Sequence, residues 1–180
     1  IMMQSFISMG IVTTIWWLVG YSLAFSGGKG GVIGNLDWIG LRHVGEAPGP
    51  WAPTIPAGAH FVFQEMFAII TPALITGAFA ERKRFASFVL FTVLWSILVY
   101  SPIAHWVWAT DGWLYKLGAL DFAGGTVVHA SSGLSALIVA LLIGRRVVNG
   151  EALEPHDIPM TVLGAGLLWF GWFGFNAGSA

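Results

Sequence analysis

The chain has 180 residues, of which 56% are hydrophobic and only 9% are charged, and its formal net charge is -1. A soluble domain carries roughly a quarter charged residues, so this composition, with a mean hydropathy of +0.76, excludes a soluble globular protein and predicts a membrane protein. The sequence contains no cysteine, which excludes disulfides, thiol chemistry and cysteine-based metal or iron–sulfur sites.

Five charge-free stretches divide the chain, and most of them reach the roughly 18 to 20 residues that span the core of a bilayer. The alternating segments of about ten residues that form outer-membrane strands are absent from the sequence. We therefore predict an all-α membrane protein, a polytopic transmembrane helical bundle with five spans. The helices are expected at about residues 5–25, 57–80, 86–109, 122–144 and 158–175.

The connections and the ends indicate how the chain is organised. Residues 26–56 are rich in glycine and proline, which predicts a long surface loop. Residues 81–85 are too few for anything but a turn between antiparallel helices. Because the sequence begins and stops inside apolar runs, we expect residues 1–180 to form a single partial transmembrane domain that is truncated at both ends.

The basic residues indicate the orientation of the helices. Five of the eight lysine and arginine residues lie in the two short connections that follow the second and fourth helices. Positively charged short loops stay on the cytoplasmic side, so these two helices are expected to run inward. The outer side then carries a set of tryptophans that resembles an interfacial belt: Trp38, Trp51, Trp106, Trp108 and Trp113.

A histidine inside a span is the first candidate for function. His129 lies in the fourth apolar run, about 12 Å deeper than Asp121 at 1.5 Å per residue. Ionisable groups in a span usually face a bundle interior or a pathway, although a core histidine bonded to a neighbouring helix fits the position equally well. No second ligand follows at helical spacing, so the sequence favours no metal site and we expect no cofactor.

Two acidic residues lie near the expected outer ends of helices. Asp121 precedes the fourth helix, where its side chain can accept hydrogen bonds from the unpaired N–H groups of the first turn. A negative charge there would also favour a nearby cation. Glu65 in the second helix is expected to lie near the outer interface and to be solvated, with a pathway role as the alternative.

Aromatic residues from several helices are expected to meet toward the outer face. Phe67, Trp108 and Phe175 taken singly are typical of core packing or an interfacial belt. Together, however, their faces can attract a desolvated cation, and the hydroxyl of Ser179 can add a polar contact. Pro72 and the proline at position 102 predict kinks in the second and third helices.

Several motifs together resemble the ammonium transporter family, the Amt, Mep and Rh proteins, and the Amt branch most closely. The residues that carry the resemblance are GYSLAF (20–25), PALITGAFAERKRF (72–85), SPIAHWVW (101–108), GALDFAGGTVVH (118–129) and GWFGFNAGSA (171–180). The resemblance implies a fold of eleven spans, of which this chain matches spans two to six. It also implies homotrimers with one pore in each subunit.

The resemblance assigns expected roles to individual residues. It implies that Phe67, Trp108 and Ser179 form an outer site that recruits ammonium, and that Phe67 and Phe175 form a gate. Asp121 is implied to shape the mouth rather than to touch the substrate. Trp172 is implied to line the conduction path, and His129 to be the first of two pore histidines, the second belonging to a later span. Glutamate at position 65 departs from the small or neutral residues usual in the family.

The resemblance therefore implies a non-enzymatic ammonium transporter or channel. The cation is expected to bind the outer rings, lose its proton near the gate and cross as ammonia past the pore histidine. The expected location is the plasma or inner membrane, as a multi-pass protein in a lipid bilayer. A PII-type regulatory protein is an expected partner on the cytoplasmic face, at residues 82–84 and 145–149, and no nucleic-acid partner is expected.

Three alternatives differ from this interpretation. An ammonium sensor would use the same fold and signal through a cytoplasmic domain. A haem or electron-transfer bundle would use His60, His105 and His129 and needs ligands at matching depth, whereas His105 is expected near the outer end of its helix and His129 deeper. An intramembrane hydrolase lacks an aspartate pair within the spans and a serine in a nucleophile motif.

Overall fold

The computed structural model describes residues 2–28, 30–146 and 154–180. Within these residues five helical segments are long and apolar enough to cross a membrane. This result confirms the predicted polytopic all-α fold with five spans. The segments are Met2–Phe25, Ala57–Phe79, Phe85–Lys116, Gly125–Ile143 and Ile158–Ala177.

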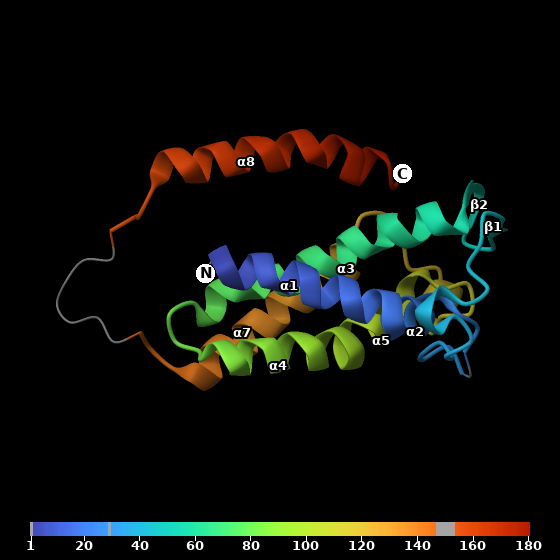
Figure 1. The fold of residues 1–180 in the computed structure, drawn as a ribbon, viewed down its shortest axis with the longest axis horizontal. Helices are drawn as coiled ribbons and strands as arrows, with labels where there is room; N and C mark the ends of the chain where they lie inside the picture. Colours follow the sequence, from blue (N-terminus) through green and yellow to red (C-terminus); the bar gives the residue numbers. More distant parts are fainter. Residues whose placement is uncertain (1, 29, 147–153) are drawn as a thin grey trace.

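The first span consists of α1 (Met2–Ile15), a π-helical segment (Trp16–Gly20) and α2 (Tyr21–Phe25). The ring of Trp16 is buried, and its indole N–H donates to the carbonyl of Phe61 at 3.3 Å. A side chain at Gly20 would meet the same ring at 2.8 Å, so only glycine fits there. These contacts pack the first span against the second (Figure 1).

The connection between the first two spans is mostly exposed, as predicted for a surface loop, although two of its tryptophans pack against the first span. It contains a 3-10 turn (Ile39–Leu41) and a short hairpin of β1 (Pro48–Gly49) and β2 (Ala52–Pro56). Trp38 stacks on Tyr21 with 5.9 Å between ring centroids, and Trp51 packs against Phe25 at 5.9 Å. Glycine and proline mark the irregular backbone of this loop, but they do not reveal that the two tryptophans pack against the first span.

The second and third spans each contain a proline. Helix α3 (Ala57–Phe79) continues through Pro72. The third span comprises α4 (Phe85–Trp95), a π-helical segment (Ser96–Tyr100) and α5 (Ser101–Trp108), with a proline in the first turn of α5. A proline has no N–H to donate, so the ladder of hydrogen bonds is rearranged in the preceding turn. The short helix α6 (Trp113–Lys116) follows α5.

The fourth span begins three residues later than predicted. It starts with a π-helical segment (Gly125–Ala130) and continues as α7 (Ser131–Ile143). Gly124 has a φ of 88°, a left-handed conformation that side chains rarely adopt. The chain therefore turns at Gly124 before the helix begins, and Phe122 lies outside it.

The two basic connections lie together at one end of the bundle. The guanidinium of Arg82 donates to the carbonyls of Ala78 and Gly144, and Arg146 forms an ion pair with Glu81 at 3.5 Å. The ammonium of Lys83 lies 4.0 Å from the centre of the Phe91 ring. Desolvation lowers the pKa of Lys83 below its usual value.

The fifth span contains α8 (Ile158–Trp172) followed by a π-helical segment (Phe173–Ala177). The carboxylate of Asp157 caps α8 by accepting from the N–H of Met160 at 2.9 Å. None of the α8 residues is buried, and Figure 1 shows α8 lying apart from the other helices along most of its length. Its aromatic contacts with the bundle are made by its C-terminal end, through Trp172 and Phe175.

Candidate functional site

The end of the bundle opposite the basic connections contains a cleft of about 530 Å³, which we call the outer cleft. Its walls come from α2, the β1–β2 hairpin, the start of α3, the end of α5, the segment before the fourth span and the C-terminal residues. Segments far apart in the sequence therefore meet at one site. The lining residues used below are Trp51, His60, Phe63, Gln64, Trp108, Asp121 and Ser179.

Phe67 brings the predicted aromatic residues together. Its side chain is only 1% exposed, and its ring lies 4.4 Å from that of Phe175 and 5.3 Å from that of Trp108, centroid to centroid. The Trp108 ring meets Phe67 edge to face, at 70°. Rings from three different spans, which were predicted to meet, are therefore in contact.

Ser179 lines the outer cleft beside these rings. Its hydroxyl donates to the carbonyl of Phe175 at 2.6 Å, one helical turn earlier. Because that hydrogen bond uses the hydroxyl proton, the oxygen keeps its lone pairs free to accept. A donor such as an ammonium ion would meet an acceptor at this position.

A row of rings leads from the outer cleft to His129, and we call it the aromatic path: Trp108, Phe67, Phe175, Trp172 and His129. Trp172 stacks on Phe175 at 4.7 Å and 24°, and the His129 ring lies 6.1 Å from that of Trp172. A second cavity of about 410 Å³ is lined by both His129 and Trp172. Asp121 lines this cavity as well as the outer cleft, so the two cavities adjoin.

Asp121 accepts four backbone hydrogen bonds at the start of the fourth span. One carboxylate oxygen accepts from the N–H groups of Gly124 and Gly125 at 2.6 and 2.8 Å. The other oxygen accepts from Thr126 and Val127 at 2.8 and 3.0 Å. These are the N–H groups that a helix start leaves unpaired, and the carboxylate also suits the positive end of the helix.

The backbone of Asp121 also fixes the orientation of Trp108. Its carbonyl accepts the indole N–H of Trp108 at 2.7 Å. One residue thus sets both the start of the fourth span and the position of a ring in the outer cleft. With four N–H donors already bound, the carboxylate can act on a cation through its charge but has little free capacity to ligate it.

His129 is held differently. It lies in the π-helical segment Gly125–Ala130, its side chain is exposed, and its imidazole makes no hydrogen bond to the part of the chain that the structure describes. Its ring contact is with Trp172. The imidazole is therefore available to a small molecule in the second cavity.

Sequence reasoning places Phe63 toward the outer face but gives it no role, and it misses a polar group around His60. The Phe63 ring lines the outer cleft and meets Phe67 at 5.0 Å, and its position one helical turn before Phe67 was the available signal. His60 Nδ1 lies 2.8 Å from the indole nitrogen of Trp51 and 3.0 Å from the hydroxyl of Tyr21. No sequence pattern pairs residues from three separate segments in this way.

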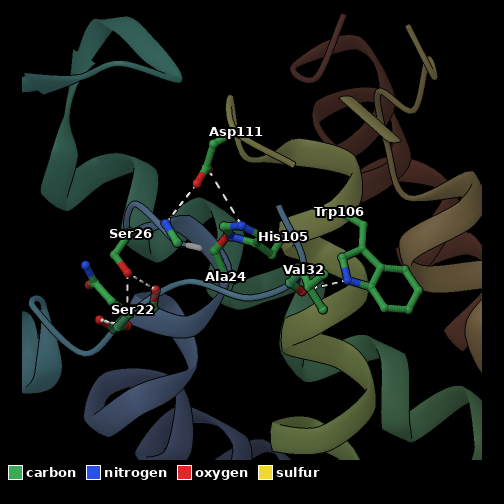
Figure 2. Close-up of polar contacts among 9 residues, drawn as sticks. Ser22, Ala24, Ser26, Val32, His105, Trp106 and Asp111 are labelled. Carbon is green, nitrogen blue, oxygen red and sulfur yellow. Dashed lines mark hydrogen bonds and ion pairs between the residues drawn. The ribbon is translucent and has the colours of Figure 1, made fainter. Parts of the chain in front are cut away.

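A buried histidine joins the third span to the first, and neighbouring groups join the third span to the first connection (Figure 2). His105 Nδ1 donates to the carbonyl of Ala24 at 3.0 Å, and its other nitrogen lies 3.6 Å from Asp111. Asp111 also accepts the N–H of Gly28 at 2.8 Å, and Trp106 donates to the carbonyl of Val32. His60 and His105 are thus each engaged by separate protein groups, which disfavours the haem alternative.

The structure corrects the prediction that Glu65 is solvated. Glu65 is only 8% exposed. It lies four residues after Phe61 and three before Ala68, and both are buried, so the helical repeat places Glu65 on the packed side of α3.

Comparison with known proteins places this geometry in a family. The family model described as "Ammonium Transporter Family" matches residues 1–180. The "Ammonium transporter" of Bacillus subtilis is 54% identical over 99% of this chain and 43% of the relative. The crystal structure of Saccharomyces cerevisiae Mep2 superimposes with a TM-score of 0.89 at 44% identity, covering 97% of this chain and 41% of that one.

A further solved structure, described as "Sensor Amt Protein", superimposes with a TM-score of 0.84 at 33% identity, over 98% of this chain and 45% of that one. The chain thus spans about two fifths of the length of the relatives it matches. The family match covers every residue, and four of the five quoted motifs contribute residues to the outer cleft or the aromatic path. The chain belongs to the ammonium transporter family.

Proposed function

We propose that this chain forms the outer mouth and the first part of the conduction path of an ammonium transporter. Ammonium binds in the outer cleft, loses its proton near Phe67 and Phe175, and passes as ammonia along Trp172 to His129. The observation that carries the proposal is the aromatic path, in which neighbouring ring centroids lie 4.4 to 6.1 Å apart from the outer cleft to His129.

Recruitment of the cation follows from the chemistry of the outer cleft. The π face of Trp108 attracts a cation, an interaction worth about 0.5 to 2 kcal/mol depending on desolvation. Phe67 is buried and does not line the cleft, but it contacts Trp108 and supports that ring. Ser179 adds a hydroxyl oxygen that accepts from an N–H of the ion. Na⁺ has no N–H to donate, and rings with one hydroxyl replace its hydration shell poorly, so the site favours ammonium.

The gate follows from the contact between Phe67 and Phe175. With ring centroids 4.4 Å apart, the two side chains leave no room for a hydrated ion without moving. A charge in an apolar span is penalised by about 3 kcal/mol or more, whereas ammonia is neutral. Loss of a proton before the gate therefore lowers the barrier, and the rings need to separate only enough for a small neutral molecule.

His129 serves the neutral molecule beyond the gate. A neutral imidazole has one N–H donor and one acceptor nitrogen, and ammonia has both kinds of partner. Hydrogen bonding to His129 offsets the loss of water in the second cavity. The proton released at the cleft either returns outside or follows through a histidine relay, and this choice decides whether transport carries net charge.

The assembly and its regulation follow the family. We propose a multi-pass protein of the plasma or inner membrane that forms a homotrimer, and a PII-type protein docking on the cytoplasmic face. The exposed Arg84 and Arg145 beside the connection between α3 and α4 support such a docking surface. Of the second predicted contact, residues 147–149 lie outside the described residues.

An ammonium sensor is the second candidate function. The likeness to the solved "Sensor Amt Protein" favours it specifically. The same cleft would bind ammonium, and a cytoplasmic domain would transmit the signal. A signalling domain in the full-length protein, together with slow transport, would select this candidate.

Transport by the full-length protein tests the proposal. The protein is reconstituted into lipid vesicles, and a gradient of ammonium or methylammonium is applied. The expected result is uptake, or a transient current, that saturates with concentration and is unaffected by Na⁺. Absence of both uptake and current in protein that inserts correctly would contradict the proposal.

A further inference from the structure

The outer cleft contains a second indole that the aromatic path does not use. Trp51 lies between β1 and β2, far in sequence from Trp108, yet both side chains line the same cleft. Trp51 also packs against Trp38, with 4.8 Å between ring centroids. The connection between the first two spans therefore contributes one ring to the lining of the cleft.

The N–H of Trp51 is bound by His60. The indole nitrogen lies 2.8 Å from His60 Nδ1, and an indole nitrogen can only donate. His60 Nδ1 must therefore carry a lone pair and no proton. The hydroxyl of Tyr21, 3.0 Å from the same atom, is a second donor to it. This pair of contacts selects the imidazole form whose proton is on Nε2.

Trp51 and Trp108 are bound in the same manner. Trp108 donates its N–H to the carbonyl of Asp121, and Trp51 donates its N–H to His60. In each case the positive N–H end of the indole is held by a protein acceptor. A donated hydrogen bond also polarises the ring toward greater electron density. Both rings line the cleft, and the π system is the part of an indole that attracts a cation.

We propose that Trp51 is a second cation-binding ring of the outer cleft, and that His60 is the residue that positions it. The inference rests on the proposed function, because it deepens the description of the same ammonium site. The site then contains one ring from α5 and one from the connection between the first two spans. His60 acts through Trp51 and does not itself touch the cation.

The test compares leucine substitutions of three outer tryptophans in the full-length protein reconstituted into vesicles. Trp51→Leu is expected to raise the KM for methylammonium about two- to five-fold, the loss of one cation–ring contact, with little change in Vmax. Trp108→Leu serves as the positive control. Trp106→Leu is the matched control, because Trp106 also donates its N–H, to Val32, but does not line the cleft.

A double-mutant cycle tests the role of His60. His60→Leu removes the acceptor and is expected to raise the KM in the wild-type background. Trp51→Phe keeps a ring but has no N–H, so the hydrogen bond to His60 is already absent. In that background His60→Leu is expected to change the KM by less than about twofold. A residue that only supports the fold would lower Vmax and the unfolding temperature equally in both backgrounds.

The outcomes separate this inference from the proposed function. If Trp108→Leu raises the KM while Trp51→Leu leaves it at the wild-type value, Trp51 is no cation-binding ring and the proposed function stands. If the Trp51→Leu protein does not insert into the membrane, Trp51→Phe is the deciding variant. Its smaller ring is expected to give a KM between those of wild type and Trp108→Leu. A wild-type KM for Trp51→Phe would overturn the inference. If the wild-type protein itself transports no ammonium, the proposed function fails.

Discussion

The outer cleft and the surroundings of His129 are built in opposite ways. Phe67 is 1% exposed and contacts rings from three spans, and Asp121 accepts four backbone N–H groups. His129 is exposed, and its ring contacts Trp172 at 6.1 Å. Within these residues the outer cleft is therefore held by many contacts, whereas the ring contact of His129 is with Trp172, in a chain that spans about two fifths of its relatives' length. Substitutions at the first are expected to change folding and affinity, and at the second to change conduction.

Asp121→Asn is expected to have the largest effect, because it disrupts the outer site at its base. An amide nitrogen cannot accept hydrogen bonds, so at least two of the four N–H groups lose their partner, and the remaining bonds lose their charge. Each lost charge-assisted bond is worth about 1.5 to 3 kcal/mol. We expect a strong drop in unfolding temperature and no measurable uptake, checked by thermal unfolding in detergent and by vesicle transport.

Asp37→Asn is the matched control for this variant. Asp37 is exposed, and among the described residues its carboxylate accepts a hydrogen bond only from the side chain of Asn35. If Asp121→Asn unfolds at the wild-type temperature, or if Asp37→Asn loses as much stability, the four hydrogen bonds of Asp121 do not stabilise the start of the fourth span.

His129→Ala probes the other region. We expect Vmax to fall at least tenfold, since a group that exchanges hydrogen bonds or protons with the substrate typically contributes that much or more. The unfolding temperature should stay within about 2 °C of wild type, because no described hydrogen bond depends on the imidazole. A large loss of stability would mean that His129 is a packing residue.

Trp108→Leu tests whether the outer cleft sets the affinity for the cation. The substitution keeps an apolar side chain but removes the π face and the indole N–H that bonds to Asp121. We expect the KM for methylammonium to rise about five-fold, with Vmax reduced less. Concentration-dependent uptake measures both parameters, and an unchanged KM would remove Trp108 from the cation site.

Arg82→Gln is expected to have the smallest effect on transport. Arg82 joins the ends of α3 and α7 at the basic end of the bundle, by donating to Ala78 and Gly144. Losing these bonds should lower stability by about 1 to 2 kcal/mol while leaving the KM unchanged. Thermal unfolding and uptake check this together, and a changed KM would mean that the two ends of the bundle are coupled.

The sequence predicted the features that depend on composition and local capping. Long charge-free runs located the five spans, because burying polar backbone in lipid requires helices of that length. Asp121 was recognised as a helix start because an aspartate before an apolar run has unpaired N–H groups within reach. The family motifs then brought Phe67, Trp108 and Phe175 to one site, and the structure places their rings in contact.

Features that depend on packing between distant segments were beyond the sequence. The π-helical segments, such as Ser96–Tyr100, leave no mark in a uniformly apolar run. The hydrogen bond between Trp51 and His60, and the burial of Glu65, depend on which face of α3 meets its neighbours. A uniformly apolar helix has little amphipathic pattern to reveal that face.

The central claim is that recruitment and conduction belong to different residues of the aromatic path. One measurement tests it most directly: methylammonium uptake against concentration for Trp108→Leu and His129→Ala, in vesicles prepared alike. We expect a raised KM with a largely preserved Vmax for Trp108→Leu, and a lowered Vmax with a largely preserved KM for His129→Ala. If both variants change the same parameter to a similar extent, the division between cleft and conduit is contradicted.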